Sequence, residues 1–173
     1  MIQTYLKIDL GENTYIRTIS GANVDLIRSW VSEKLNWKPT RCFLVCGIHD
    51  ILEGETSSNI LDSIGTVITE LKNKNENMEI NICQLVPTLR VNELEDIINY
   101  YNNQLLEWST DNGVSVIKCE LSFKLGTGEV DELCFHQEHE HSGVFSNRCG
   151  AVRLLESINK QCDHFNLCND EEN

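Results

Sequence analysis

The sequence predicts an α/β protein, a three-layer α/β/α sandwich around a mainly parallel sheet, flavodoxin-like in the broad sense. Short apolar runs of strand length alternate along the chain with stretches whose apolar residues recur at helical spacing. The run 41–46 is apolar throughout after Arg41, which is typical of a strand buried on both faces of a parallel sheet, and 78–86 is a second candidate. Right-handed crossovers between such strands place helices on both faces of the sheet.

Each expected strand is a short apolar run, and each expected helix carries an apolar stripe. The expected strands are 14–19, 41–46, 78–86 and 114–119. The expected helices are 24–35, 60–71, 94–108 and 152–158. Pro87 ends the third strand because proline cannot donate to a sheet ladder, and the 111–113 turn ends the long helix at a glycine. Residues 1–165 are predicted to form a single domain, and the acidic tail 166–173 is expected to fray.

Composition narrows the class of function. The chain has 173 residues, enough for one domain with a core, and 27 acidic against 14 basic residues give it a net charge of −13. This charge argues against a nucleic-acid phosphate binder, which needs clustered cations. No apolar run approaches the roughly 20 residues of a membrane helix, and no signal segment opens the sequence. We therefore expect no membrane partner and an intracellular protein.

The eight cysteines are expected to be reduced thiols. An even count fits disulfides, but the chain is long enough to build a core without them and carries no secretion signal. Cys42, Cys46 and Cys83 lie in the apolar runs, where cysteine behaves as a small buried hydrophobe. No Cys-x-x-Cys pair occurs, which argues against a zinc ribbon or a thioredoxin-type site, and no cofactor is expected.

In parallel sheets the functional site lies at the carboxyl ends of the strands. Four segments follow expected strands and belong to this edge. They are Ser20-Gly21, 47–50, 86–88 and 121–147.

These segments carry a family resemblance. Gly47-Ile48-His49-Asp50, after an apolar strand, resembles the Gly-x-Asn-Asp block of the SGNH/GDSL-type hydrolases. Ser20-Gly21-Ala22 resembles the block whose glycine donates a backbone N–H to the oxyanion hole. Residues 82–87 resemble the strand after the Asn block, and 142–150 resemble the last block, an Asp-x-x-His segment that opens the final helix. The resemblance covers about residues 15–160 and implies an SGNH hydrolase-like fold and ester chemistry.

The chemistry of that family needs a serine nucleophile, a histidine base, an aspartate that orients it and oxyanion donors. No Gly-Asp-Ser occurs in this sequence, and His49 stands where the Asn donor is expected. In the last block His141 falls at the Asp position and Val144 at the His position, so Gly21 alone matches a functional residue. Either the chain has lost the first strand with its nucleophile, or residues 1–10 supply a substitute strand without the serine.

The densest chemical cluster is 134–141, with three histidines interleaved with acids. Three interpretations are open. It is a solvated loop, a metal site of His136, His139 and His141, or a relocated acid–base pair of Glu138 and His141. The helical zinc pattern His-Glu-x-x-His is absent, so we assign no metal ligand.

The candidate catalytic residues are therefore His49, Glu138 and His141, with Gly21 and His49 as oxyanion-hole donors. A competing interpretation has His49 only filling a turn while Asp50 caps the segment that follows.

The favoured function is a degenerate SGNH-like domain that does not hydrolyse esters and acts by binding, either a small ester or acylated ligand or a protein partner. Similar domains occur in retrotransposon-encoded proteins, and this chain resembles that kind. An active esterase or acetylhydrolase with the rearranged set His49, Glu138 and His141 is the first alternative. A metal-binding module built on the 136–141 histidines is the second.

Overall fold

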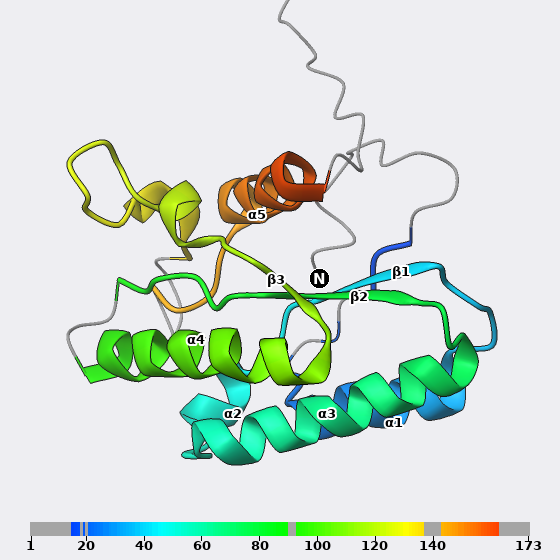
Figure 1. Cartoon of the computed structure of the whole chain (residues 1–173). Coiled ribbons are helices and arrows are strands. Elements are labelled where there is room, and N and C mark those ends of the chain that lie inside the picture. The colour runs from blue at the N-terminus through cyan, green and yellow to red at the C-terminus, as the bar shows by residue number, and fades with distance from the viewer. Residues whose placement is uncertain (1–14, 18, 20, 90–92, 137–142, 163–173) are drawn as a thin grey trace, which may run out of the picture.

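The computed structural model describes residues 15–17, 19, 21–89, 93–136 and 143–162 of the chain (Figure 1). Its elements alternate between helix and strand as the sequence predicts. In chain order they are α1 Val24–Lys34, β1 Arg41–Leu44, α2 Ile48–Leu52, α3 Ser57–Lys74, β2 Glu79–Cys83, α4 Glu93–Asn112, β3 Ser115–Ile117, the 3-10 helices η2 Glu120–Phe123 and η3 Glu132–Cys134, and α5 Arg148–Cys162.

The described strands form one parallel sheet in the order β1-β2-β3. Cys42 of β1 pairs with Ile80 of β2, and Ile82 of β2 pairs with Val116 of β3. Helices α1 to α4 cover one face of the sheet and α5 covers the other (Figure 1). The predicted three-layer arrangement with a mainly parallel sheet is confirmed.

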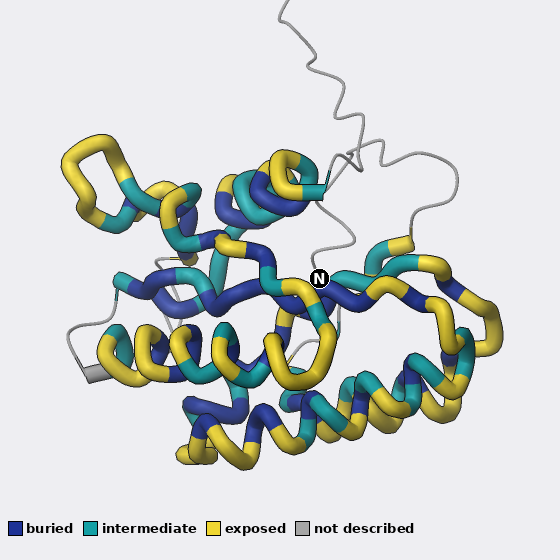
Figure 2. Tube along the Cα trace, in the orientation of Figure 1, coloured by how far each residue is buried: buried dark blue, intermediate teal, exposed yellow. Residues whose placement is uncertain are grey.

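Figure 2 shows buried residues along the strands and on the helices of both layers, and apolar side chains form clusters on each side of the sheet. The larger cluster joins Ile80 and Ile82 of β2 to Ile64 of α3 and Leu105 of α4, all nearly or fully buried. The smaller cluster lies under α5 and includes Cys83, Cys119 and Ile158. Both faces of the central strand β2 are therefore buried, whereas β1 and β3 are partly buried.

Local chemistry sets the helix starts. The Asn23 side chain accepts a hydrogen bond from the Leu26 N–H at 3.1 Å and begins α1, and the Thr56 hydroxyl accepts one from the Asn59 N–H at 3.2 Å and begins α3. None of the described helices is long and apolar enough to cross a membrane.

The predicted strand 14–19 is wrong for the residues described there, since 15–17 and 19 have no strand conformation. Their side chains serve another purpose. The Tyr15 ring packs edge-on against Trp37 with centroids 5.9 Å apart, and the Arg17 guanidinium lies 5.8 Å from the centre of the Trp30 ring. These side chains thus contact α1 and the loop after it. The expected substitute strand 1–10 and the tail 166–173 lie outside the described residues.

Candidate functional site

The turn after β1 is built around a glycine that no other residue can replace without strain. Gly47 has φ of +108°, and a Cβ there would lie 3.1 Å from Oη of Tyr101 and 3.5 Å from Cγ2 of Ile60. The missing side chain lets the start of α2 lie close to Tyr101 of α4. His49 and Asp50 consequently project from α2 at the carboxyl edge of the sheet.

The Asp50 carboxylate ties α2 to the start of α1. The Val24 N–H donates to it, 3.1 Å from one oxygen and 3.2 Å from the other, and the side chain is buried. Asn23 adds a second link by donating from Nδ2 to the Glu53 carboxylate at 3.2 Å. Because the exposed turn at Gly21 directly precedes α1, the Gly21 segment and the 47–50 segment adjoin. Asp50 thus caps α1 as well as standing at the start of its own helix.

Burial raises the pKa of Asp50 above its ordinary value, against the opposing effect of the Val24 and Asp50 backbone N–H groups that bind the carboxylate. The folded state therefore holds this proton to a higher pH than the unfolded chain does. Below the unfolded pKa the Asp50 carboxyl is protonated in both states and does not lower the free energy of unfolding. Its contribution to that free energy falls as the pH rises from about 3.8 to the folded pKa.

We expect the Asp50→Asn variant to lack the decrease in the free energy of unfolding that ionisation of Asp50 causes. Urea unfolding of both proteins at several pH values from about 3.5 to 7 measures it. The unfolding free energy of wild type minus that of the variant should decrease with rising pH and then level off. A difference that stays constant or increases contradicts the assignment.

His49 is covered by an aromatic ring from a distant segment. Its imidazole stacks on the Phe145 ring, with centroids 4.9 Å apart and planes 23° from parallel. Phe145 belongs to the segment that leads into α5. One face of the His49 ring is therefore closed to a ligand.

The segment after β2 joins the same assembly. The Thr88 hydroxyl and the Leu89 N–H both donate to the Gly143 carbonyl oxygen at 2.8 Å. An antiparallel bridge pairs Phe135 with Ser146 and holds the ends of the last segment together. The contacts from Val24 to Asp50, from His49 to Phe145 and from Thr88 to Gly143 therefore link the segments that the sequence places at the carboxyl edge.

Tyr101 of α4 lies beneath this edge and was not found by sequence reasoning. Its side chain is fully buried, and its hydroxyl has no hydrogen-bond partner among the described residues. Burial raises its pKa well above the ordinary value, and Cys46 and Asp50 add to the effect. Position in the apolar stripe of the helix predicted the burial, but no sequence signal marked the hydroxyl.

Replacing Tyr101 by phenylalanine should raise the free energy of unfolding by about 1 kcal/mol, because an unsatisfied buried hydroxyl is removed. Tyr100→Phe, one residue away and exposed, is the matched control and should change it by less than about 0.5 kcal/mol. Urea denaturation measures both. Destabilisation of Tyr101→Phe beyond the control would mean that the hydroxyl is bound.

Cys46, next to Gly47, is the nearest thiol to the turn in sequence. Burial, followed by the nearby Asp50 carboxylate, raises its pKa to about 12. A thiol with that pKa holds almost no thiolate at neutral pH, which is typical of a buried packing cysteine.

No family model matches the sequence and no curated protein matches it. Solved structures do match. A putative platelet activating factor from Streptococcus pneumonia superposes with a TM-score of 0.73 at 17% identity, over 92% of this chain and 78% of that one. A lipolytic G-D-S-L family protein from Veillonella parvula gives 0.67 at 17% identity, over 90% and 84%. The OSK domain of Drosophila Oskar gives 0.63 at 18% identity, over 83% and 72%.

The chain has an SGNH hydrolase-like fold. The predicted resemblance to that family is confirmed at the level of architecture.

The predicted site residues of the SGNH-like chain meet only in part. Gly21 and His49 lie on adjoining segments of the edge, whereas Glu138 and His141 lie outside the described residues. His139 is also outside them, so the three-histidine interpretation is not tested. Within the described ranges, no group of three or more His, Cys, Asp or Glu residues is placed to hold a metal ion.

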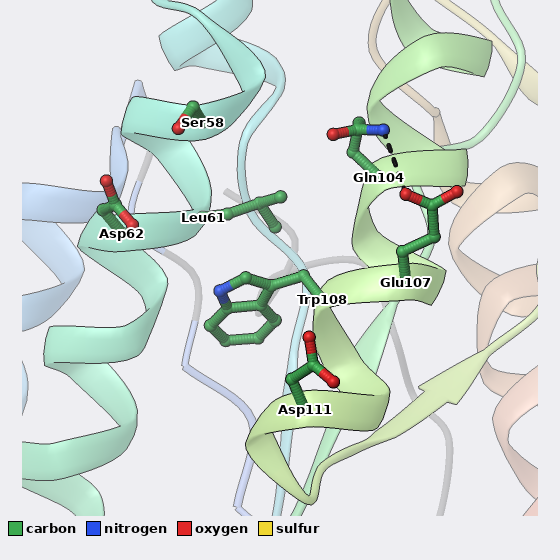
Figure 3. A pocket seen from close by; sticks show the side chains of 7 residues that line it. All are labelled: Ser58, Leu61, Asp62, Gln104, Glu107, Trp108 and Asp111. Carbon is green, nitrogen blue, oxygen red and sulfur yellow. Dashed lines mark hydrogen bonds between the residues drawn. The ribbon is translucent and has the colours of Figure 1, made fainter.

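Two cavities in the described part of the structure are lined by other parts of the chain. One of about 250 Å³ opens between α3 and α4, where the Trp108 indole lies among carboxylates from both helices (Figure 3). The other, of about 590 Å³, runs along β2, β3 and the end of α5. Neither cavity is lined by a residue of 47–50, 86–88 or 143–147.

Proposed function

We propose that this chain is a non-hydrolytic SGNH-like domain that acts by binding a protein partner. The observation that carries the proposal is the position of Val144, where the family resemblance expects the base. Val144 is 4% exposed, and a valine side chain cannot accept a proton.

The nucleophile side of the reaction supports the same proposal. No Gly-Asp-Ser occurs in the sequence, and burial keeps the Cys46 thiol protonated. The stacked Phe145 ring covers one face of the imidazole of His49, the histidine that follows β1 in place of the expected Asn donor. An ester carbonyl at this edge would thus meet an imidazole that is closed on one face, with no base at position 144.

Exposed leucines favour a protein partner. Leu121 of η2 and Leu133 of η3 are 84% and 76% exposed, and each directly follows a glutamate, Glu120 and Glu132. Both belong to residues 118–136, which follow β3 and which we call the lobe (Figure 1). Exposed apolar residues beside acidic ones suit a partner with an apolar face and a basic rim, and the net charge of −13 adds long-range attraction.

The hydrolysis test uses the full chain with p-nitrophenyl acetate and a fluorophosphonate serine probe. We expect a rate equal to that of denatured protein and no labelled serine. Turnover that is lost in His49→Ala would overturn the proposal. It would favour the alternative, an esterase in which His49, Glu138 and His141 form the acid–base set and Gly21 serves the oxyanion hole.

The binding test compares Leu121→Ser and Leu133→Ser with Leu26→Ser, a leucine exposed elsewhere, on α1. A partner captured by the wild-type chain should be lost with the two lobe variants and kept with the control. Equal capture by all of them would remove the lobe from the proposal.

A further inference from the structure

Two free cysteines from different elements face each other beside the last segment. The Sγ atoms of Cys134, at the end of η3, and Cys149, in the first turn of α5, are 3.9 Å apart. Cys134 is fully buried, whereas Cys149 is exposed. A small reagent in solution can therefore reach Cys149, whereas Cys134 is shielded from it.

Backbone contacts hold the two sulfurs in place. Asn147 donates from Nδ2 to the carbonyl oxygens of Leu133 and Phe135 at 2.8 and 3.0 Å, and its N–H donates to the Cys134 carbonyl at 2.9 Å. The Gly150 N–H in turn donates to the Asn147 side chain at 3.2 Å. One asparagine thus fixes the start of α5 against η3, and the sulfur–sulfur separation is set by this framework.

Arg153 adds a cation to the pair. It forms an ion pair with Asp131 and interacts electrostatically with both thiols. A cation at this point stabilises the negative sulfur that forms during thiol–disulfide exchange. Burial, with a smaller contribution from Cys149, raises the pKa of Cys134 to about 11, so the buried thiol is the poorer first nucleophile.

The chain offers an internal comparison. Cys83 and Cys119 also contact each other through their side chains, but both are fully buried. No oxidant in solution reaches that pair. Exposure of one member distinguishes Cys134 and Cys149.

We propose that Cys149 is a site of reversible modification by low-molecular-weight disulfides such as glutathione disulfide, and that Cys134 resolves the adduct into a Cys134–Cys149 disulfide. The Cys149 thiolate attacks one sulfur of glutathione disulfide, forms a mixed disulfide and releases one glutathione. Cys134 then attacks Sγ of Cys149, and its proton passes to the departing thiolate, which leaves as the second glutathione. Two protein thiols are oxidised and one glutathione disulfide is reduced to two glutathiones.

The bond needs the sulfurs to approach from 3.9 Å to about 2.05 Å. The bond would link Cys134 to Cys149 covalently and so join the two ends of the segment that carries Phe145. The inference is independent of the proposed binding function.

The test incubates the full chain in glutathione buffers of increasing oxidation, blocks the remaining thiols and maps the peptides by mass spectrometry. We expect a Cys134–Cys149 peptide that dithiothreitol removes, and a rise in Tm of about 5 °C in the oxidised protein. Cys149→Ser, at an exposed position, should abolish both, and the half-buried Cys162→Ser should leave both unchanged. Cys134→Ser should stop at the glutathione adduct on Cys149.

Two results would overturn the proposal. One is a stable glutathione adduct on wild-type Cys149 that never converts to the internal bond. The other is oxidation that joins other cysteines and persists in Cys149→Ser.

Discussion

Replacing Gly150 by alanine should lower the free energy of unfolding by about 4 kcal/mol. A Cβ at this position would lie 2.4 Å from the Cys134 carbonyl oxygen, 2.6 Å from the Ser146 Cβ and 3.1 Å from Cε1 of Phe123. Two of these neighbours are backbone or directly attached to it, so α5 must move away from η3 to make room. Urea or thermal unfolding measures the loss.

Gly65→Ala is the matched control, since Gly65 also lies in a helix, α3. Its Cβ would meet the Trp108 ring at 3.5 Å, an ordinary contact. Alanine is the better helix former, so this variant should gain about 0.5–1 kcal/mol. A Gly150→Ala protein as stable as the Gly65→Ala protein would show that α5 does not pack so closely on η3.

Replacing Gly47 by alanine should cost about 3 kcal/mol, for two separable reasons. The backbone φ of +108° disfavours any side chain, and the new Cβ would press on the Tyr101 hydroxyl at 3.1 Å. Gly54 has φ of +89° and open space around it, so Gly54→Ala isolates the backbone effect and should cost about 1 kcal/mol.

A double variant separates the steric part at Gly47. If the hydroxyl of Tyr101 opposes the new methyl group, Gly47→Ala combined with Tyr101→Phe should be more stable than the sum of the single effects predicts. Strict additivity would show that the Tyr101 hydroxyl adds nothing to the cost of Gly47→Ala.

Much of the fold follows from short-range patterns. The apolar spacing over 24–35 predicts α1, observed as Val24–Lys34, because an amphipathic stripe and a capping Asn23 act within a few residues. The run 41–46 similarly predicts β1, observed as Arg41–Leu44. The strand predicted over 14–19 is wrong for the described residues there, because Tyr15 and Arg17 pack on Trp37 and Trp30, and contacts of that kind have no local sequence signal.

The site was less predictable because its decisive contacts join distant residues. The sequence places Gly21 and His49 at one edge of the sheet, but it does not reveal that Phe145 stacks on His49 across 96 positions (145 − 49). Asp50 binds the N–H of Val24, which precedes it by 26 residues. Such pairings depend on how α1, α2 and α5 assemble, and a single sequence holds no local sign of them.

The burial of Val144 bears on how this protein can evolve. Histidine at 144 would enter a position that is 4% exposed, so gaining the imidazole would carry the cost of burying a polar ring. Hydrolysis of the SGNH type also needs a serine nucleophile, so under the proposed function no single substitution supplies the whole set. If the proposed function is right, a change to an esterase requires several substitutions, and the one at position 144 costs stability before any activity is gained.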